Sequence, residues 1–479
     1  MDRGIVDLPA ELILTIFKFL DDRSRLNVSA VCKRWKSLTE NCFKWSLHLN
    51  RTFNAPACRD LIPTRRQFTN IYLKRDVRVP IILAFFKNRD QAFACTVTDI
   101  AITNALFHLL AFSNLLKTFP NLTNLYLSSV TVKLLPSDRW DVQLNDDDKP
   151  LCEQLKKLSV CDGTDGRLLQ CFTKSKLCTL ICRQQRFTRD AVLKFLSTQN
   201  CLQEIDFCRI ASNTALKFGM GTSVMMPALR NVALDYKSIT DFDGIVALLL
   251  NQENSFETVE LGHIPVLPVL TIVFENLKNL KTLHLMPGSV HDLCNELVLQ
   301  PLRSVIHLRL YDGANYGMSP TSTEYMTNEI IKNLPNLEDL ELFVSYKQSY
   351  FQSIVMNLKK LKTLTIRVTF HTNLKDLKFP PVEKLRINCF DYGPNGERIP
   401  PISMNAVGEA AEINEAVRSL TYEGVVDGQL FVFIRDTFPK LELLEVRKDL
   451  VRGCVSVAGI RCIRYRENSF FAQPMRFDS

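Results

Sequence analysis

The sequence predicts an α/β protein in which a short all-helical segment, residues 1–50, precedes a long solenoid of strand and helix repeats, residues 51–479. Three observations predict this architecture. The first fifty residues carry an amphipathic helical pattern, a short apolar string recurs at regular spacing through the rest of the chain, and helical patterns separate the copies of that string.

The N-terminal segment reads as two short helices. Pro9 suits the first position of a helix, where its missing N–H has no intrahelical partner to lose. Four apolar residues then fall on one stripe at i, i+3, i+4 and i+7: Ile13, Ile16, Phe17 and Leu20. A second helix with the same spacing follows, capped by Asp21, Asp22 or Ser24 and carrying Val28, Val31, Cys32 and Trp35. Because so short a segment cannot bury this much apolar surface by itself, we expect some of these side chains to pack against a partner.

The motifs of this segment resemble the F-box family. They are a Leu-Pro pair at 8–9, Glu two residues after Pro, an Ile-Phe pair at 16–17, Phe-Leu at 19–20 and Val-Cys-Lys-Arg-Trp at 31–35. The resemblance implies docking on a Skp-family adaptor, and through it on the cullin and RING subunits of a ubiquitin ligase. Carried over by position, the adaptor-binding residues are Leu8, Pro9, Ile16, Phe17, Leu20, Val31 and Trp35. The sequence departs from the family at Arg25, and the alternative is a helical cap whose apolar residues only fill its own core.

The repeated string is apolar-x-x-apolar-x-apolar. Its clear copies begin at residues 122, 155, 280, 337 and 361, and weaker copies begin at 68, 97, 177, 202, 229, 256, 305, 382, 417, 441 and 460. These sixteen starts lie about 26 residues apart on average, within the roughly 20 to 29 residues of leucine-rich repeats. Helical patterns lie between several copies, at residues 191–196, 243–250, 267–277, 290–299, 325–334, 351–358 and 430–438.

This arrangement is similar to the leucine-rich-repeat family, which implies a horseshoe-shaped solenoid of about sixteen irregular repeats. It departs from the family in lacking a regular Asn at the ninth position of the repeat. Since concave solenoid surfaces bind partners, the outward strand residues are the candidates for target binding. Those with side chains that often dominate binding energy are Arg309, Tyr311, Glu341, Phe343, Arg367 and Arg386.

These six residues allow two interpretations. Arginines on neighbouring strands suit an acidic or phosphorylated target, because the guanidinium group offers a bidentate fork to a carboxylate or phosphate. In the competing interpretation, Asp339 and Glu341 neutralise the arginines and leave exposed ion pairs of little energetic consequence. Long intervals between strings add loops at residues 145–150, 311–320 and 389–401 as further contact candidates.

Composition and charge exclude several classes. The hydrophobic fraction of 46% and the charged fraction of 23% are typical of a folded soluble protein, and no apolar run reaches the ~18 residues of a membrane span. The fifteen scattered cysteines predict buried reduced thiols, as at Cys32, Cys201 and Cys208, in a cytoplasmic or nuclear protein. The net charge of +8 lies wholly in residues 1–90, which does not fit a basic stripe for nucleic acid along the solenoid.

Catalytic motifs are absent from the sequence. There is no phosphate-binding Gly loop, zinc-binding His-Glu-x-x-His helix or Gly-x-Ser-x-Gly turn, and the acidic residues at 146–148 lack the spacing of a calcium loop. We therefore expect no cofactor or metal and no enzyme activity. The prediction is a substrate receptor of a ubiquitin ligase; the alternatives are a scaffold or inhibitor that binds a protein without its degradation, and a self-contained hydrolase.

Overall fold

The chain falls into two compact units. One comprises Met1–Asp206 with Val224–Ala228, and the other comprises Phe207–Ser223 with Leu229–Ser479. The computed structural model describes residues 8–20, 22–42, 44–49, 67–74, 94–133, 151–183, 195–207, 226–235, 242–251, 253–264, 266–287, 298–311, 320–345, 347–368, 377–389, 391–392, 398–399, 412–426, 428–447 and 462–466. The boundary expected at residue 50 stays a prediction.

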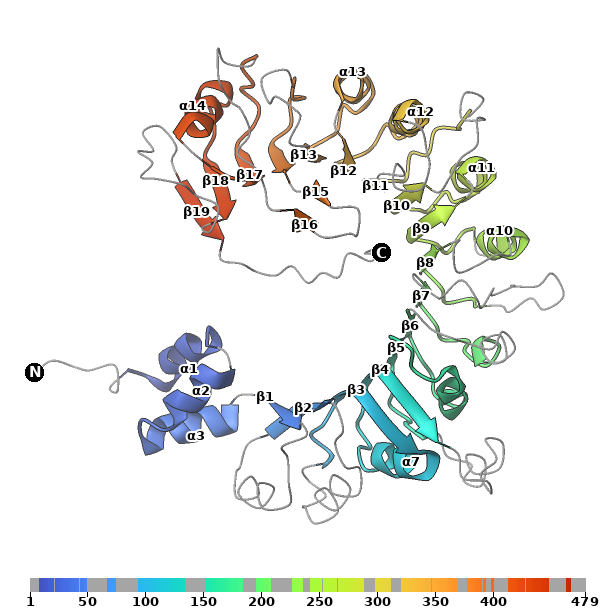
Figure 1. The fold of residues 1–479 in the computed structure, drawn as a ribbon, viewed down its shortest axis with the longest axis vertical. Coiled ribbons are helices and arrows are strands. Elements are labelled where there is room, and N and C mark those ends of the chain that lie inside the picture. The colour runs from blue at the N-terminus through green and yellow to red at the C-terminus, as the bar shows by residue number, and fades with distance from the viewer. Residues whose placement is uncertain are drawn as a thin grey trace, which may run out of the picture. The chain divides into compact units, whose positions relative to one another are not determined.

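Three short helices open the first unit: α1 (Ala10–Lys18), α2 (Asp22–Ser29) and α3 (Lys33–Cys42) (Figure 1). Pro9 is the N-cap of α1, with φ −52° and ψ 147°, so the helix begins one residue later than the sequence predicts. The rings of Phe17 and Trp35 meet edge to face with their centroids 5.2 Å apart. Arg25 donates from Nε to the Phe17 carbonyl (3.1 Å) and from Nη2 to the Lys18 carbonyl (3.2 Å). It therefore adds a side-chain donor at the C-terminal end of α1, where the Phe17 carbonyl also accepts from the backbone N–H of Leu20 (3.2 Å).

A strand follows α3 directly, where the sequence predicts an all-helical segment. This is β1 (Lys44–Leu49), which pairs in parallel with β2 (Gln67–Lys74). Trp45, Leu47 and Leu49 are buried while Lys44 and His48 are exposed, the alternation of a strand with one buried face. The indole Nε1 of Trp45 donates to the Thr39 carbonyl at 3.0 Å and so joins β1 to α3.

The remaining strands of the first unit continue the parallel ladder one after another. They are β3 (Asp99–His108), β4 (Asn124–Lys133), β5 (Lys157–Cys161), β6 (Thr179–Cys182) and β7 (Glu204–Phe207), whose last residue belongs to the second unit. The connections contain α7 (Leu109–Lys117) and the 3₁₀ helix η2 (Gly166–Phe172). Neither helix is among the helical patterns expected from the sequence. Residues 101–116, a largely apolar stretch of the sequence, form most of β3 and of α7. No helix in the described ranges is long and apolar enough to cross a membrane.

The second unit carries a second ladder in which each described strand pairs in parallel with the next. Its strands are β8 (Asn231–Asp235), β9 (Thr258–Ile264), β10 (Thr282–Pro287), β11 (His307–Tyr311), β12 (Asp339–Ser345), β13 (Thr363–Arg367), β14 (Lys384–Asn388), β17 (Ser419–Glu423), β18 (Leu443–Arg447) and β19 (Cys462–Arg466). A small hairpin, β15 (Asp391–Tyr392) with β16 (Arg398–Ile399), lies in the expected loop at 389–401.

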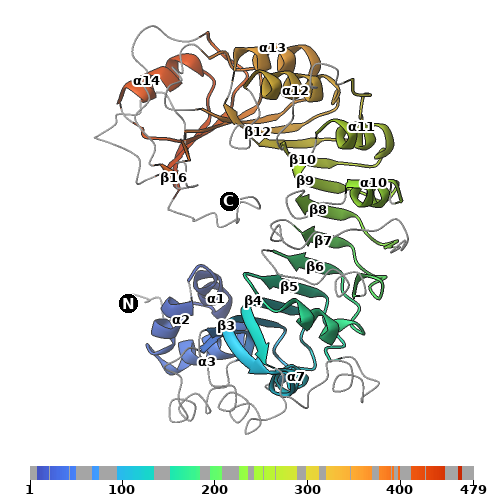
Figure 2. The same cartoon turned by 45° about the vertical axis from the view of Figure 1, so that its right-hand side comes forward.

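The helices of the second unit are α10 (Phe242–Asn251), α11 (Val266–Asn276), α12 (Pro320–Lys332), α13 (Gln348–Asn357) and α14 (Gly428–Thr437). The helical patterns expected at these places are confirmed. Helices α10 to α13 follow one another along the same side of the strands (Figures 1 and 2). The expected helix at 290–299 and the expected loops at 145–150 and 311–320 lie largely outside the described residues, as does most of the helix at 191–196.

A backbone contact recurs at the start of the strands. The carbonyl just before a strand accepts two N–H groups from the next repeat: Thr98 accepts from Thr123 (2.8 Å) and Asn124 (3.0 Å), and Ile306 accepts from Glu338 (2.9 Å) and Asp339 (3.0 Å). The same contact is made by the carbonyls of Thr123, Lys156, Cys178, Arg230, Glu257, Lys281, Glu338, Glu383 and Arg418. It fixes the register of each strand on its neighbour and confirms a repeated α/β architecture.

Asparagine side chains reinforce the same entrance of the repeat, just before the string. Asn121 donates from Nδ2 to the Cys95 carbonyl (2.7 Å), Asn279 to that of Asn254 (2.8 Å) and Asn336 to that of Arg303 (2.8 Å). Each bond reaches back to the preceding repeat and so adds a side-chain bond to the backbone contact of the same two repeats.

Two glycines near the end of the second unit give a matched stability test. A Cβ on Gly424 meets the Tyr422 ring at 2.7 Å, whereas a Cβ on Gly428 meets nothing within 4 Å. Since Tyr422 is 1% exposed, its ring has little room to move. We expect Gly424→Ala to lower the free energy of unfolding by about 1–3 kcal/mol and Gly428→Ala to leave it unchanged or raise it by up to about 1 kcal/mol. Urea denaturation measures both; equal midpoints would contradict the packing described.

Candidate functional site

The first candidate surface lies on α1. Leu12, Ile16 and Phe19 follow one another at i, i+4 and i+7, so they share one stripe of the helix and its C-cap. Their exposed fractions are 52%, 41% and 86%, which is unusual for large apolar side chains so close together. We call these three residues the α1 stripe. Val31, at the start of the connection into α3, is also exposed, at 61%.

The seven residues expected from the F-box resemblance divide into three groups in the structure. Pro9, Ile16 and Val31 are exposed, and Leu8 and Leu20 are half-buried. Phe17 and Trp35 are 3% and 8% exposed and pack together in the core of the helical segment. Leu12 and Phe19 are exposed but were not among the seven expected adaptor-binding residues. Their signal in the sequence is that they are apolar and lie outside the stripe of Ile13, Ile16, Phe17 and Leu20, since a single buried face does not need them.

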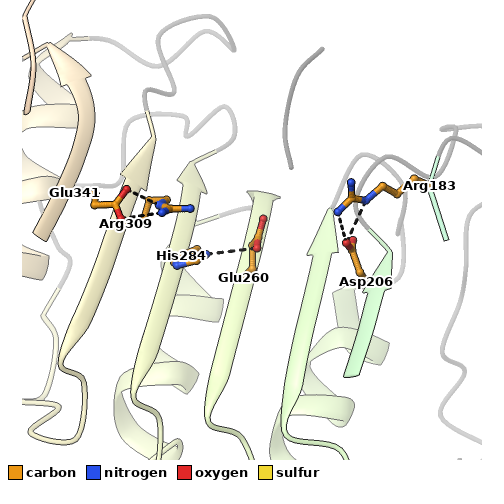
Figure 3. A network of polar contacts seen from close by, with 6 residues as sticks. All are labelled: Arg183, Asp206, Glu260, His284, Arg309 and Glu341. Atoms are coloured by element: carbon orange, nitrogen blue, oxygen red, sulfur yellow. Dashed lines mark hydrogen bonds and ion pairs between the residues drawn. The ribbon is translucent and has the colours of Figure 1, made fainter. Parts of the chain in front are cut away.

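The second candidate surface is the strand face of the second unit, meaning the side chains that alternate with the buried leucines. Arg309 on β11 lies opposite Glu341 on β12, and two residues further along the same strands Tyr311 lies opposite Phe343. Arg309 donates from Nε to Oε2 of Glu341 (2.8 Å) and from Nη2 to Oε1 (2.7 Å) (Figure 3). Burial alone would lower the pKa of the Arg309 guanidinium, but the hydrogen bonds to Glu341 outweigh it, so this pKa is raised.

Two aromatic rings continue this cluster. Tyr311 and Phe343 stack with their centroids 5.1 Å apart and their planes inclined by 13°, and the guanidinium carbon of Arg309 lies 5.8 Å from the Phe343 centroid. Burial raises the pKa of Tyr311 to about 12, so its hydroxyl stays protonated at neutral pH. Ala233 and Met286, buried at 3% and 6% exposure, pack with Tyr311 as an apolar floor. We call Tyr311, Phe343 and Arg309 the aromatic shelf.

Carboxylates accompany this strand face at several positions. Glu260 is 1% exposed, and its Oε2 lies 3.4 Å from Nδ1 of His284 (Figure 3). His307 and Asp339 form a similar pair at 3.3 Å. Burial raises the pKa of Asp339, and the neighbouring Glu341 adds to this effect. In the first unit, Asp206 is likewise buried and accepts from Arg183 at 2.6 Å (Figure 3).

The structure separates the six expected target-binding residues. Arg309, Tyr311, Glu341 and Phe343 are brought together on β11 and β12. An irregularity in the pairing of β12 with β13 sets Arg367 opposite Ser345 and not opposite Phe343. Arg386 lies in the register row of Arg309 and Glu341, beyond Thr365, and its ion-pair partner is Glu423 on β17. One continuous aromatic and basic surface is therefore not formed.

These pairings correspond in part to the competing interpretation of the arginines, since Asp339 pairs with His307 and not with an arginine. Arg309 and Arg386 both have carboxylate partners within the protein, and Glu341 neutralises Arg309 as the competing interpretation expects. The partner of Arg386 was missed. Arg386 is an outward residue of the strand expected after the string at 382, and Glu423 is an outward residue of the strand expected after the string at 417. The sequence therefore placed both side chains on the same strand face.

Cysteine chemistry offers no further site in the described ranges. Burial raises the pKa of Cys152 to about 12, that of Cys161 to about 11 and that of Cys389 to about 12, which makes these thiols poor nucleophiles. Cys32 and Cys201 are only half-buried, less than the sequence predicts, and Cys208 lies outside the described residues. Among the described residues, no group of three or more His, Cys, Asp or Glu side chains is arranged to hold a metal ion.

Comparisons with known proteins bear on the N-terminal segment. The F-box-like family profile matches residues 5–48. The F-box/WD repeat-containing protein pof10 of Schizosaccharomyces pombe is 41% identical over 44 residues, which is 9% of this chain and 7% of that protein. The N-terminal segment is therefore an F-box-like domain, and the match spans only a small part of either chain.

One solved structure aligns over nearly the whole length. The crystal structure of the Rad7 and Elc1 complex in yeast contains a chain that is 12% identical to this one, with 95% of this chain and 96% of that chain covered. The TM-score is 0.36, a value too low for this likeness to inform either fold or function.

A double-mutant cycle tests the central pair of the strand face. We expect Arg309→Met and Glu341→Gln to show a coupling energy of about 1–2 kcal/mol in the free energy of unfolding, because the bond is bidentate and both side chains are about three-quarters buried. The control is Lys362 with Glu338, an ion pair of 2.7 Å whose side chains are 62% and 42% exposed. Its coupling should be clearly smaller, because water screens an ion pair whose two side chains are both exposed. Equal couplings in the two cycles would show that Arg309 and Glu341 are not held as described.

Proposed function

We propose that the chain is the target-binding subunit of a cullin-RING ubiquitin ligase. Its F-box-like domain docks on a Skp-family adaptor, and its repeat region, which we propose to be of the leucine-rich-repeat type, holds a protein target. The observation that carries this proposal is the exposed α1 stripe in a domain that matches the F-box-like family. Three large apolar side chains in water favour burial by a partner, with roughly 1.5–3 kcal/mol gained for each side chain buried.

The proposed mechanism is proximity. The adaptor links the F-box-like domain to a cullin and a RING subunit, which brings a ubiquitin-charged conjugating enzyme near the captured target. Holding the two reactants together raises their effective concentration without a catalytic residue in this chain. We propose that this occurs in the cytoplasm, the nucleus or both.

We propose that the adaptor is contacted by the exposed and half-buried members of the F-box motif together with the α1 stripe. These are Leu8, Pro9, Leu12, Ile16, Phe19, Leu20 and Val31. Phe17 and Trp35 act from beneath, because their packing sets the position of α1 relative to α3. The distinction separates residues whose loss removes a contact from residues whose loss disturbs the domain.

The target surface is proposed on the strand face of the second unit. The aromatic shelf supplies two large rings and an arginine, the side chains that most often dominate binding energy. Because Glu341 holds both arms of the Arg309 fork, the shelf is already ordered and little side-chain entropy is lost on binding. A target that stacks on the rings fits this surface better than one that needs an unpaired arginine.

Adaptor docking is tested by comparing leucines of equal exposure. Leu12 and Leu106 are both 52% exposed, but only Leu12 belongs to the α1 stripe. We expect Leu12→Asp with Ile16→Asp to weaken binding to a purified Skp-type adaptor by at least about a hundredfold, since a charge in each apolar contact costs several kcal/mol. Leu106→Asp should bind as the unmodified chain does. Isothermal titration calorimetry measures the affinities, and an adaptor that does not discriminate the variants would exclude docking through α1.

Target capture is tested with the shelf removed. We expect Tyr311→Ala with Phe343→Ala to lose specifically captured proteins from cells while keeping the adaptor, measured by affinity purification and mass spectrometry. The matched control is Tyr325→Ala with Met356→Ala on α12 and α13, two side chains with exposures of 37% and 72%. A shelf variant that keeps its full set of captured proteins would place the target surface elsewhere. Captured proteins that are neither ubiquitinated nor degraded would favour the scaffold alternative.

A further inference from the structure

Two tyrosines on the strand face of the first unit flank a small residue. Tyr72 on β2 stands opposite Ala101 on β3, and Ala101 stands opposite Tyr126 on β4. On the far side of Tyr72, His48 of β1 continues the same register row. The row therefore reads His48, Tyr72, Ala101, Tyr126, with only a methyl group between the two tyrosines.

The spacing of this row matches that of stacked rings. Neighbouring strands lie about 4.8 Å apart, so the backbone positions of Tyr72 and Tyr126 are about 9.6 Å apart. A flat group above Ala101 would lie one strand spacing, about 4.8 Å, from the backbone position of each tyrosine, a separation within the roughly 6 Å reach of a cation over an aromatic face. His48 and Tyr72 show that neighbours in this row stack, since their centroids are 4.5 Å apart and their planes are inclined by only 6°. Tyr126 is 38% exposed, so solvent reaches this part of the row.

We call the space above Ala101, between Tyr72 and Tyr126, the gap. A carboxylate lies at one end of it. Asp99 precedes Ala101 by two residues on β3, so its side chain lies on the same face of the strand. Its Oδ1 accepts from Nδ2 of Asn124 (2.6 Å) and its Oδ2 accepts from the Thr98 hydroxyl (2.5 Å). A carboxylate has about four acceptor positions, so both oxygens keep capacity for a further donor. The two bonds hold the carboxylate in place beside the gap.

We propose that the site formed by Tyr72, Ala101, Tyr126 and Asp99 binds an arginine side chain of a protein partner. The guanidinium group is planar, stacks on aromatic faces and presents a fork that fits a carboxylate. Between the two tyrosines it extends the stack that His48 and Tyr72 begin, and its N–H groups reach Asp99. Lys74, two residues beyond Tyr72 on the same face and exposed, repels a cation at the other end and so directs the guanidinium toward Asp99.

The same features disfavour two other occupants. A lysine ammonium is a compact charge with no flat surface, so it does not stack against both rings. A nucleic-acid base would stack on the rings, but its phosphate groups would approach the Asp99 carboxylate and be repelled. The site shares no residue with the α1 stripe or the aromatic shelf, and the proposal does not depend on docking of the adaptor.

Fluorine NMR of the full chain labelled with 3-fluorotyrosine tests this proposal. The probe is N-acetyl-arginine-N-methylamide, and the matched probes are the citrulline and lysine analogues. We expect the arginine probe to shift the signals of Tyr72 and Tyr126, assigned through Tyr72→Phe and Tyr126→Phe, with a dissociation constant in the millimolar range of a single side chain. The citrulline analogue, which has the same shape without the charge, should bind at least about tenfold more weakly.

Variants on β3 and β4 make the test specific. Ala101→Leu fills the gap and should abolish the shifts, while Thr131→Leu enlarges an exposed side chain of β4 outside the site and should leave them unchanged. Asp99→Asn should weaken binding about tenfold. Circular dichroism checks that each variant is folded. Shifts that are absent with the arginine probe, that persist in Ala101→Leu, or that the dinucleotide TpT produces at lower concentration would overturn the proposal.

Discussion

The repeated backbone contact, in which one carbonyl accepts two N–H groups of the next repeat, is the constraint on which the rest of the structure depends. It occurs at the entrance of most described strands in both units, with donor to acceptor distances of 2.7 to 3.1 Å. Because side chains alternate along a strand, a slip of one residue would turn every outward side chain inward. The register rows of these strands, and the cross-strand pairs such as Arg309 with Glu341, follow from this contact.

The register explains why side-chain chemistry gathers where it does. Residues about 19 to 35 positions apart in sequence become neighbours, as do Arg309 and Glu341 on β11 and β12. Rings at adjacent positions stack, as in Tyr311 with Phe343 and His48 with Tyr72. Charges at adjacent positions pair, which keeps partly buried arginines and carboxylates from standing uncompensated. The strand faces are therefore ordered polar and aromatic surfaces, whereas the α1 stripe is apolar and exposed.

Much of the strand pattern was predictable from the sequence. Fifteen strands begin two residues after the start of an expected string, because burial of the two later apolar residues is a local requirement that the sequence states directly. Strand β1 was missed because its alternation at Trp45, Leu47 and Leu49 follows the helical segment without a turn signal. Helix α7 was missed although its signal was present, since Leu109, Phe112 and Leu116 are buried and lie at i, i+3 and i+7.

The partners of individual side chains were less predictable. The sequence identifies Arg386 as an outward residue, but its pairing with Glu423 depends on β14 lying beside β17 after a long insertion. The displacement of Arg367 from Phe343 depends on an irregularity in β12 that no pattern announces. The F-box motif likewise marks the domain without separating exposed residues from core residues, since Ile16 and Phe17 are adjacent in sequence and opposite in burial.

We propose that α1 docks an adaptor while the strand face of the second unit remains available for a target. Hydrogen–deuterium exchange of the full chain, alone and with a purified Skp-type adaptor, tests this directly. We expect the adaptor to slow exchange in Ala10–Lys18 and to leave exchange in β11 and β12 unchanged. Slowed exchange at β11 and β12 with none at α1 would contradict it.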